Sequence, residues 1–114
     1  MGNCIFCDIV QHKIKADIVE EDNEILAFKD INPQAPIHIL IIPKKHIASV
    51  NDLTKEDYYI VGKICYIAKK LAEKEKISEN GYRLIINTGK NAGQAVSHLH
   101  FHLLGGRTFF WPPG

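Results

Sequence analysis

The stretch SHLHFHLLGG, residues 97–106, places three histidines at alternate positions of an apolar run. Because successive side chains of a β-strand point to opposite faces of a sheet, a strand here sets His98, His100 and His102 on one face. The leucine and phenylalanine residues between them share the other face, which we expect to be core. The histidine face is then expected to be wet, or to be filled by a ligand or a metal.

Three adjacent imidazoles are costly unless they are used. Each buried imidazole needs a partner at both nitrogens, and charging all three rings would add mutual repulsion. Two uses fit the pattern. Histidines at i and i+2 of a strand can ligate one metal ion, and imidazole suits nucleophilic or acid–base chemistry at neutral pH.

The preceding segment, NTGKNAGQ at residues 87–94, favours chemistry on a phosphate. Gly89 and Gly93 let backbone N–H groups converge, which is how glycine-containing loops hold anions. A phosphate bound there would lie beside the imidazoles. Such a loop alone is usually only a turn, so its position next to three aligned histidines is what gives it weight.

Length and charge set limits on the class of protein. The chain has 114 residues and a formal net charge of +1, which suits a single domain over residues 1–114. This charge gives no case for a nucleic-acid partner or for a polybasic membrane anchor. The apolar runs are far shorter than the ~18 residues of a membrane span. No signal peptide is visible, so we expect a cytoplasmic protein. We expect it to bind neither nucleic acid nor a membrane.

The remaining pattern predicts an α+β domain. Residues 17–30 indicate two short strands around the turn EDNE, and residues 37–45 indicate a buried strand. A capping-box-like TKED opens a helix expected over residues 54–76. Residues 82–87 and 97–106 complete five strands. Because only one long helix is available for a crossover, the sheet should be mostly antiparallel, with that helix on one face.

The cysteines add a second candidate site. Their number, three, argues against a disulfide framework in a chain without a targeting signal. Cys65 falls in the helical pattern and is expected to be a small buried hydrophobe. Cys4 and Cys7 form a C-x-x-C that could be redox-active or could bind metal. A redox motif would be expected near a βαβ pattern, which is absent.

The sequence HLHFHLL matches the motif His-φ-His-φ-His-φ-φ of the histidine triad (HIT) family at every position. The similarity covers nearly the whole chain. Residues 28–47 resemble the family's nucleotide-binding segment, and residues 87–94 resemble its phosphate loop. The ending GGRTFFWPPG is similar to the branch called histidine triad nucleotide-binding proteins. The resemblance implies a HIT-like fold with a five-stranded, mostly antiparallel sheet, one long helix and a short N-terminal helix.

The resemblance also implies an activity. Members bind purine nucleoside monophosphates such as AMP and GMP, and they cleave phosphoramidates of the AMP–NH2 or AMP–lysine type. By position, His100 would be the nucleophile and would form a nucleotidyl–imidazole intermediate, from which water releases the nucleotide. His102 would contact the phosphate and give a proton to the leaving amine.

The resemblance assigns further nucleotide-binding residues. Asp30 would hold the ribose hydroxyls, His38 would belong to the active-site shell, and Asn87 would lie at the phosphate end. Backbone donors around Gly93 and Gln94 would steady the phosphoryl oxygens.

Apolar residues implied for the base cleft would, without the resemblance, be ordinary core residues; they are Ile5, Phe6, Phe28 and Ile31. Ala95 departs from the family pattern, because well-known members have serine there. Its lost hydroxyl puts the rate of turnover and the leaving-group preference in doubt.

Some members, many of them bacterial, bind zinc through a cysteine pair, the histidine after the PKK strand and the first histidine of the triad. Here these positions are Cys4, Cys7, His46 and His98. The resemblance therefore implies a structural zinc site that ties the N-terminus to the sheet. It also implies a homodimer in which the tail, with Trp111, reaches toward the partner's site.

Three other functions remain open. The triad itself could hold a catalytic metal that activates water. The protein could be a nucleotide-binding or scaffold protein with little catalysis, which Ala95 makes plausible. It could also hydrolyse dinucleoside polyphosphates, although the WPPG ending argues against this.

Overall fold

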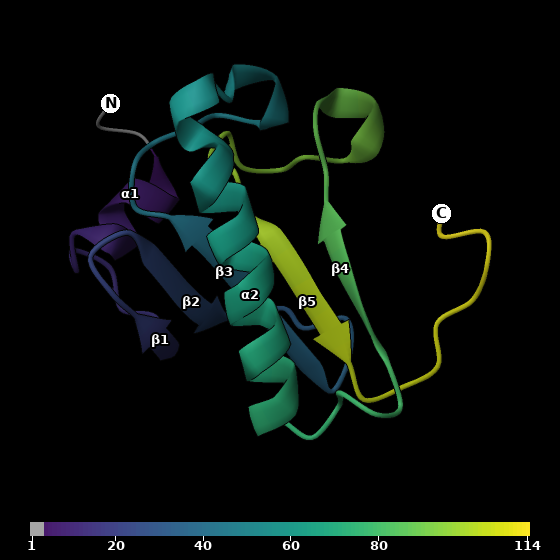
Figure 1. Ribbon diagram of the computed structural model, residues 1–114. Coiled ribbons are helices and arrows are strands. Elements are labelled where there is room, and N and C mark those ends of the chain that lie inside the picture. Colours follow the sequence, from purple (N-terminus) through teal and green to yellow (C-terminus); the bar gives the residue numbers. More distant parts are fainter. Residues whose placement is uncertain (1–3) are drawn as a thin grey trace.

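The computed structural model describes residues 4–114, so the first three residues of the expected domain 1–114 lie outside the described part. A five-stranded sheet forms its centre, with strand order β1-β2-β3-β5-β4 and antiparallel pairing throughout (Figure 1). The strands are β1 (Ile18–Glu21), β2 (Ile25–Lys29), β3 (Ile37–Pro43), β4 (Tyr82–Ile86) and β5 (Phe101–Gly105). The helices are α1 (Ile5–Val10) and α2 (Tyr58–Lys74). The predicted fold class is confirmed.

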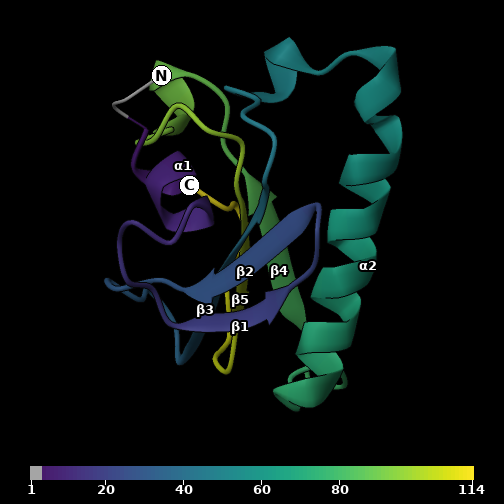
Figure 2. The same ribbon diagram turned by 90° about the vertical axis from the view of Figure 1, so that its left-hand side faces the viewer.

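The two helices cover opposite faces of the sheet (Figure 2). Between the sheet and α2 lies the larger apolar core, which includes Ile41, Ile64 and Phe101. Between the sheet and α1 lies a smaller core, which includes Phe6, Phe28 and Leu40. Strands β2 and β3 are buried on both faces, which explains why their sequences are apolar almost without alternation.

Helix α2 follows the helical spacing of its apolar residues. Thr54 and Asp57 form the expected capping box, although the first turn, Lys55–Asp57, is a 3-10 helix. The helix ends at Lys74, two residues before the predicted end. The prediction for Cys65 was wrong, because this cysteine is exposed. It lies about 100° around the helix from the buried Ile64, at the margin of the face that packs on the sheet.

The histidine stretch differs from the prediction in one respect. Strand β5 begins only at Phe101, because pairing with β3 starts at Ile41 opposite Phe101. Upstream of that pair, the Leu99 N–H donates to the carbonyl of Ile47 instead. The side chains still alternate, since Leu99 lies in the core under α2 while His98 and His100 lie toward α1. These two histidines are 0% and 6% exposed, so this part of the face is largely buried.

Within residues 4–114, no helix is both long and apolar enough to cross a membrane.

Candidate active site

The ring of His100 is held in one tautomer by the backbone. Its Nδ1 lies 2.7 Å from the carbonyl oxygen of His98. Because a carbonyl can only accept, Nδ1 carries a proton, and in the neutral ring Nε2 is the nitrogen that keeps the lone pair. The ring of Phe6 packs against the imidazole in a T-shaped arrangement, with 5.2 Å between ring centroids. A neutral imidazole with a free Nε2 lone pair and a fixed orientation is the form that a nucleophile requires.

His102 lies against His100 on the same face and is bound to a fourth histidine. The two triad rings have centroids 5.0 Å apart, and Nδ1 of His102 lies 3.0 Å from Nε2 of His38. Asp30 places a carboxylate oxygen 3.4 Å from the same His38 nitrogen. Burial, followed by the neighbouring His100 and His38, lowers the pKa of His102 to about 4. Burial also lowers the pKa of His38, although Asp30 opposes the shift.

A cleft of about 300 Å³ opens in front of these two triad histidines. Phe6 and Phe28 are buried against it, whereas Ile5 is 47% exposed and Ile31 is 99% exposed. The cleft is lined by eight of the predicted residues, namely Ile5, Phe6, Phe28, Asp30, Ile31, Ala95, His100 and His102. An apolar cleft that ends at two imidazoles and a carboxylate suits a flat apolar ring carrying a polar, anionic tail.

The other predicted nucleotide-binding residues lie outside this lining. His38 stands behind His102, and Asn87 directly follows β4, whose last residue, Ile86, pairs with Phe101. The backbone N–H groups of Gly93 and Gln94, expected to face the phosphate, instead donate within the loop.

The loop offers a different donor at the cleft. The side-chain amide of Gln94 braces the loop, accepting from Gly89 and donating to the carbonyls of Ala48 and Val96. Ala95 lines the cleft, and none of the described hydrogen bonds uses its backbone N–H. The same holds for Val96, so the backbone N–H groups of Ala95 and Val96 are available donors in the cleft lining.

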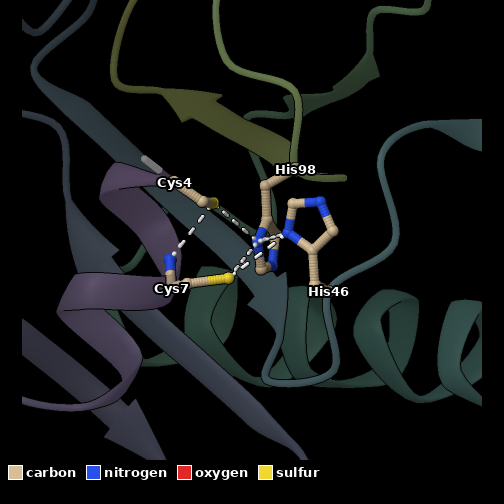
Figure 3. A group of neighbouring side chains, drawn as sticks. All are labelled: Cys4, Cys7, His46 and His98. Atoms are coloured by element: carbon tan, nitrogen blue, oxygen red, sulfur yellow. Dashed lines mark hydrogen bonds between the residues drawn. The ribbon is translucent and has the colours of Figure 1, made fainter. Parts of the chain in front are cut away.

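Cys4, Cys7, His46 and His98 come together in a second cluster (Figure 3). Nδ1 of His98 lies 3.2 Å from Nδ1 of His46, 3.4 Å from Sγ of Cys4 and 3.6 Å from Sγ of Cys7. The Sγ atom of Cys7 lies 3.3 Å from Nδ1 of His46. All four donor atoms lie within 4.8 Å of one another.

The chemistry of this cluster suits a cation. His98 Nε2 lies 2.8 Å from the carbonyl oxygen of Pro43, so it donates there and leaves a lone pair on Nδ1, inside the cluster. Burial, followed by Cys4, raises the pKa of Cys7 to about 11. Negative charge on the paired thiols thus lacks a partner, and a metal ion would supply one.

Some contributors could not be found from sequence. Pro43 and Ile47 act through backbone carbonyls, and Gln34 acts through its backbone N–H, which donates to Nδ1 of His38. Backbone contacts of this kind leave no mark on side-chain identity, because almost any residue supplies the same atoms.

The cleft beside the triad histidines is smaller than a second cavity of the protein. A larger hollow of about 620 Å³ lies between the start of β4 and the C-terminal tail, and Arg83 and Arg107 contribute to its wall. Among the described residues, its lining contains no histidine, cysteine or carboxylate. The smaller cleft is therefore the candidate active site, because it has groups that can act as nucleophile and donor.

Comparisons with known proteins agree with the triad motif. A family model described as the HIT domain matches residues 11–109. The chain is a member of the HIT family. This HIT protein is 52% identical over 103 residues to the purine nucleoside phosphoramidase of Escherichia coli K12, with 90% of this chain and 87% of that protein covered. It is 51% identical over 110 residues to an uncharacterised HIT-like protein of Synechococcus elongatus, with 96% of each covered.

Solved structures agree with the fold. The HIT protein matches a HIT family hydrolase from Legionella pneumophila with a TM-score of 0.96 and 56% identity, over 98% of this chain and 100% of that one. It matches a histidine triad nucleotide-binding protein from Candida albicans with a TM-score of 0.82 and 35% identity, over 98% and 85% of the two chains.

Proposed function

We propose that this HIT protein hydrolyses purine nucleoside phosphoramidates, of which AMP–NH2 and AMP–lysine are the type. The observation that carries the proposal is His100, a buried imidazole whose Nδ1–H is held by a carbonyl and which lines an apolar cleft beside His102. The identity of 52% to a purine nucleoside phosphoramidase supports the substrate class.

In the proposed first step, Nε2 of His100 attacks the α-phosphorus and forms a nucleotidyl–imidazole. The P–N bond to the amine breaks, and its electron pair stays on the leaving nitrogen, which must gain a proton. The family resemblance implies that His102 donates this proton. Water, which every hydrolysis requires, is the alternative donor. Water then attacks the phosphorus and releases the nucleoside monophosphate, which restores the lone pair of His100.

The cleft residues divide between the two ends of the nucleotide. Phe6 and Phe28 form the floor that would take the purine, and the exposed Ile5 and Ile31 are apolar residues that a bound base could cover. Asp30 would accept hydrogen bonds from the two ribose hydroxyls.

The phosphate end contains the two catalytic histidines. His102 would donate to a phosphoryl oxygen, and the backbone N–H of Ala95 would replace the expected donors of Gly93 and Gln94. We place Asn87 at this end from the family resemblance.

We infer that the second cluster binds a structural zinc ion. Ligand distances of ~2.3 Å for Zn–S and ~2.0 Å for Zn–N in a tetrahedral site put the donor atoms roughly 3.3–3.8 Å apart. The four separations of 3.2 to 3.6 Å between Cys4, Cys7, His46 and His98 fit this spacing. The ion would hold α1, which contains Cys7 and is capped by Cys4, against the sheet.

We infer further that the protein forms a homodimer. Strand β4 lies at the edge of the sheet, and the C-terminal tail extends away from the body (Figure 1). Phe110 and Trp111 on this tail are 75% and 84% exposed. A second copy that pairs along β4 would give this edge a partner and would bring the tail against the other chain. Light scattering after gel filtration tests the inference, and a monomer at micromolar concentration would contradict it.

The activity is tested by following AMP release from AMP–NH2. His12 is exposed, and its ring forms a hydrogen bond only with Glu21 among the described side chains, outside the cleft lining. We expect the wild-type protein and the variant His12→Gln to turn over alike, and His100→Ala to lose turnover. A diadenosine polyphosphate assayed in parallel should be a poorer substrate. Tight AMP binding without release of ammonia would instead support a binding or scaffold protein. Turnover by His100→Ala that a chelator abolishes would support a metal-dependent hydrolase.

A further inference from the structure

The atoms around His102 form a chain of hydrogen bonds that starts at an atom with a fixed role. The backbone N–H of Gln34 can only donate, and it lies 3.0 Å from Nδ1 of His38. Nδ1 of His38 is therefore an acceptor without a proton, and the proton of the neutral ring is on Nε2. His38 is 6% exposed, so water does not replace these contacts easily.

The next link fixes His102 in the same way. Nε2 of His38 carries the proton of that ring and lies 3.0 Å from Nδ1 of His102. Nδ1 of His102 therefore accepts this hydrogen bond. The proton of a neutral His102 must then be on its other nitrogen, Nε2. The carboxylate of Asp30, whose Oδ2 lies 3.4 Å from the same Nε2 of His38, favours the same arrangement because it can only accept.

A cationic His102 does not fit this chain. A second proton on its Nδ1 would face the proton on Nε2 of His38, and His38 could move its own proton only to the nitrogen that faces the Gln34 N–H. Three titratable groups face His102, namely His38, His100 and Asp30. Only Asp30 favours the cation, and burial together with the two histidines outweighs it.

We propose that His38 is a positioning residue that keeps the ring of His102 neutral with its proton on Nε2, so that His102 serves the phosphoryl group as a hydrogen-bond donor and water supplies the proton of the leaving amine. The inference rests on the proposed function for its substrate, but the tautomer itself is a property of the protein without a ligand. It deepens the role of His102, because a neutral imidazole donates hydrogen bonds well and is a weak acid.

The two steps balance with one water molecule. As Nε2 of His100 bonds to phosphorus, the P–N bond to the amine breaks and its electron pair goes to the nitrogen, which takes a proton from water. The hydroxide left behind attacks the phosphorus in the second step, and the bond from His100 to phosphorus breaks with its electron pair returning to Nε2. His102 keeps both its proton and its lone pair throughout.

Nitrogen NMR on protein with 15N-labelled histidine rings tests the tautomer directly. Comparison with His102→Gln assigns the signals, and the ligand-free protein is measured at pH 7. We expect a protonated Nε2 and an unprotonated Nδ1 for His102. A proton on Nδ1, or on both nitrogens, overturns the proposal. Because no substrate is present, this result is independent of whether the protein hydrolyses phosphoramidates.

Two variants of His38 test its positioning role. In His38→Gln, the amide oxygen can accept from Gln34 while the amide N–H donates to His102, so the tautomer and low pKa of His102 should persist. In His38→Leu, the donor is lost, and we expect a mixture of the two tautomers of His102. An unchanged His102 in His38→Leu overturns the proposal. If His38→Leu does not fold, a shifted tautomer of His102 in His38→Gln overturns the proposal instead. His12→Gln serves as the control.

Discussion

The backbone carbonyl of His98 accepts the Nδ1–H of His100 at 2.7 Å, while the side chain of the same His98 lies in the Cys/His cluster. One residue thus joins the candidate metal site to the candidate nucleophile. Phe6 adds a second connection, because its ring makes T-shaped contacts with both histidine rings and because it lies between the two cysteines in the sequence. Binding or loss of a metal ion at the cluster should therefore change the position of the residues that line the cleft.

Removal of metal should loosen α1. This helix has only six residues, and both Cys7 within it and its N-cap residue Cys4 belong to the cluster, so the ion would be its main attachment besides the small core around Phe6. We expect chelation to speed hydrogen exchange of residues 5–10 and to weaken AMP binding, measured by calorimetry. Cys7→Ser should reproduce both effects, whereas Cys65→Ser should not, since Cys65 is exposed on α2. Unaltered exchange in α1 after complete chelation would contradict this role.

The substitution Ala95→Ser should speed catalysis. Ala95 lines the cleft, so a hydroxyl there adds a donor near the phosphate, worth about 1 kcal/mol or about fivefold in kcat/KM. Steady-state assays with AMP–NH2 measure the change. Ala92→Ser, in the same loop but outside the cleft lining, is the matched control. Equal rates in both variants would exclude this explanation of the departure from the family pattern.

The capping box of α2 should make stability depend on pH. Lys45, followed by Thr54, lowers the pKa of Asp57. A carboxyl with a lowered folded pKa stabilises the protein above its unfolded pKa, about 3.9 for Asp, and this contribution is lost as pH falls through the folded pKa. We expect Asp57→Asn to unfold at lower urea than wild type at pH 7, with a difference that shrinks below about pH 4. A constant difference from pH 7 to pH 3 would contradict the assignment.

Much of the fold follows from side-chain patterns. The five strands, their antiparallel pairing and helix α2 were predicted because strands β2 and β3 are apolar and the residues of α2 repeat at helical spacing. The start of β5 could not be predicted. Residues 97–100 alternate like a strand, but they leave the ladder where β3 ends at Pro43, which has no N–H to offer.

The candidate site could be predicted as a set of side chains but not as a network. The triad motif and the resemblance placed His100 and His102 together, and the structure brings both to one cleft. The expected donors, Gly93 and Gln94, are engaged within their own loop, which depends on local turn geometry. The contact from Gln34 to His38 depends on how the loop before β3 folds back, and no spacing rule encodes it.

The central claim is that Nε2 of His100 bonds to phosphorus. Protein mixed with a purine nucleoside phosphoramidate, quenched within the first turnover and digested, can be examined by mass spectrometry. We expect a nucleotidyl adduct on His100 in wild-type protein and in His12→Gln, and no adduct in His100→Ala. Full turnover by His100→Ala, or an adduct confined to another residue, would contradict the claim.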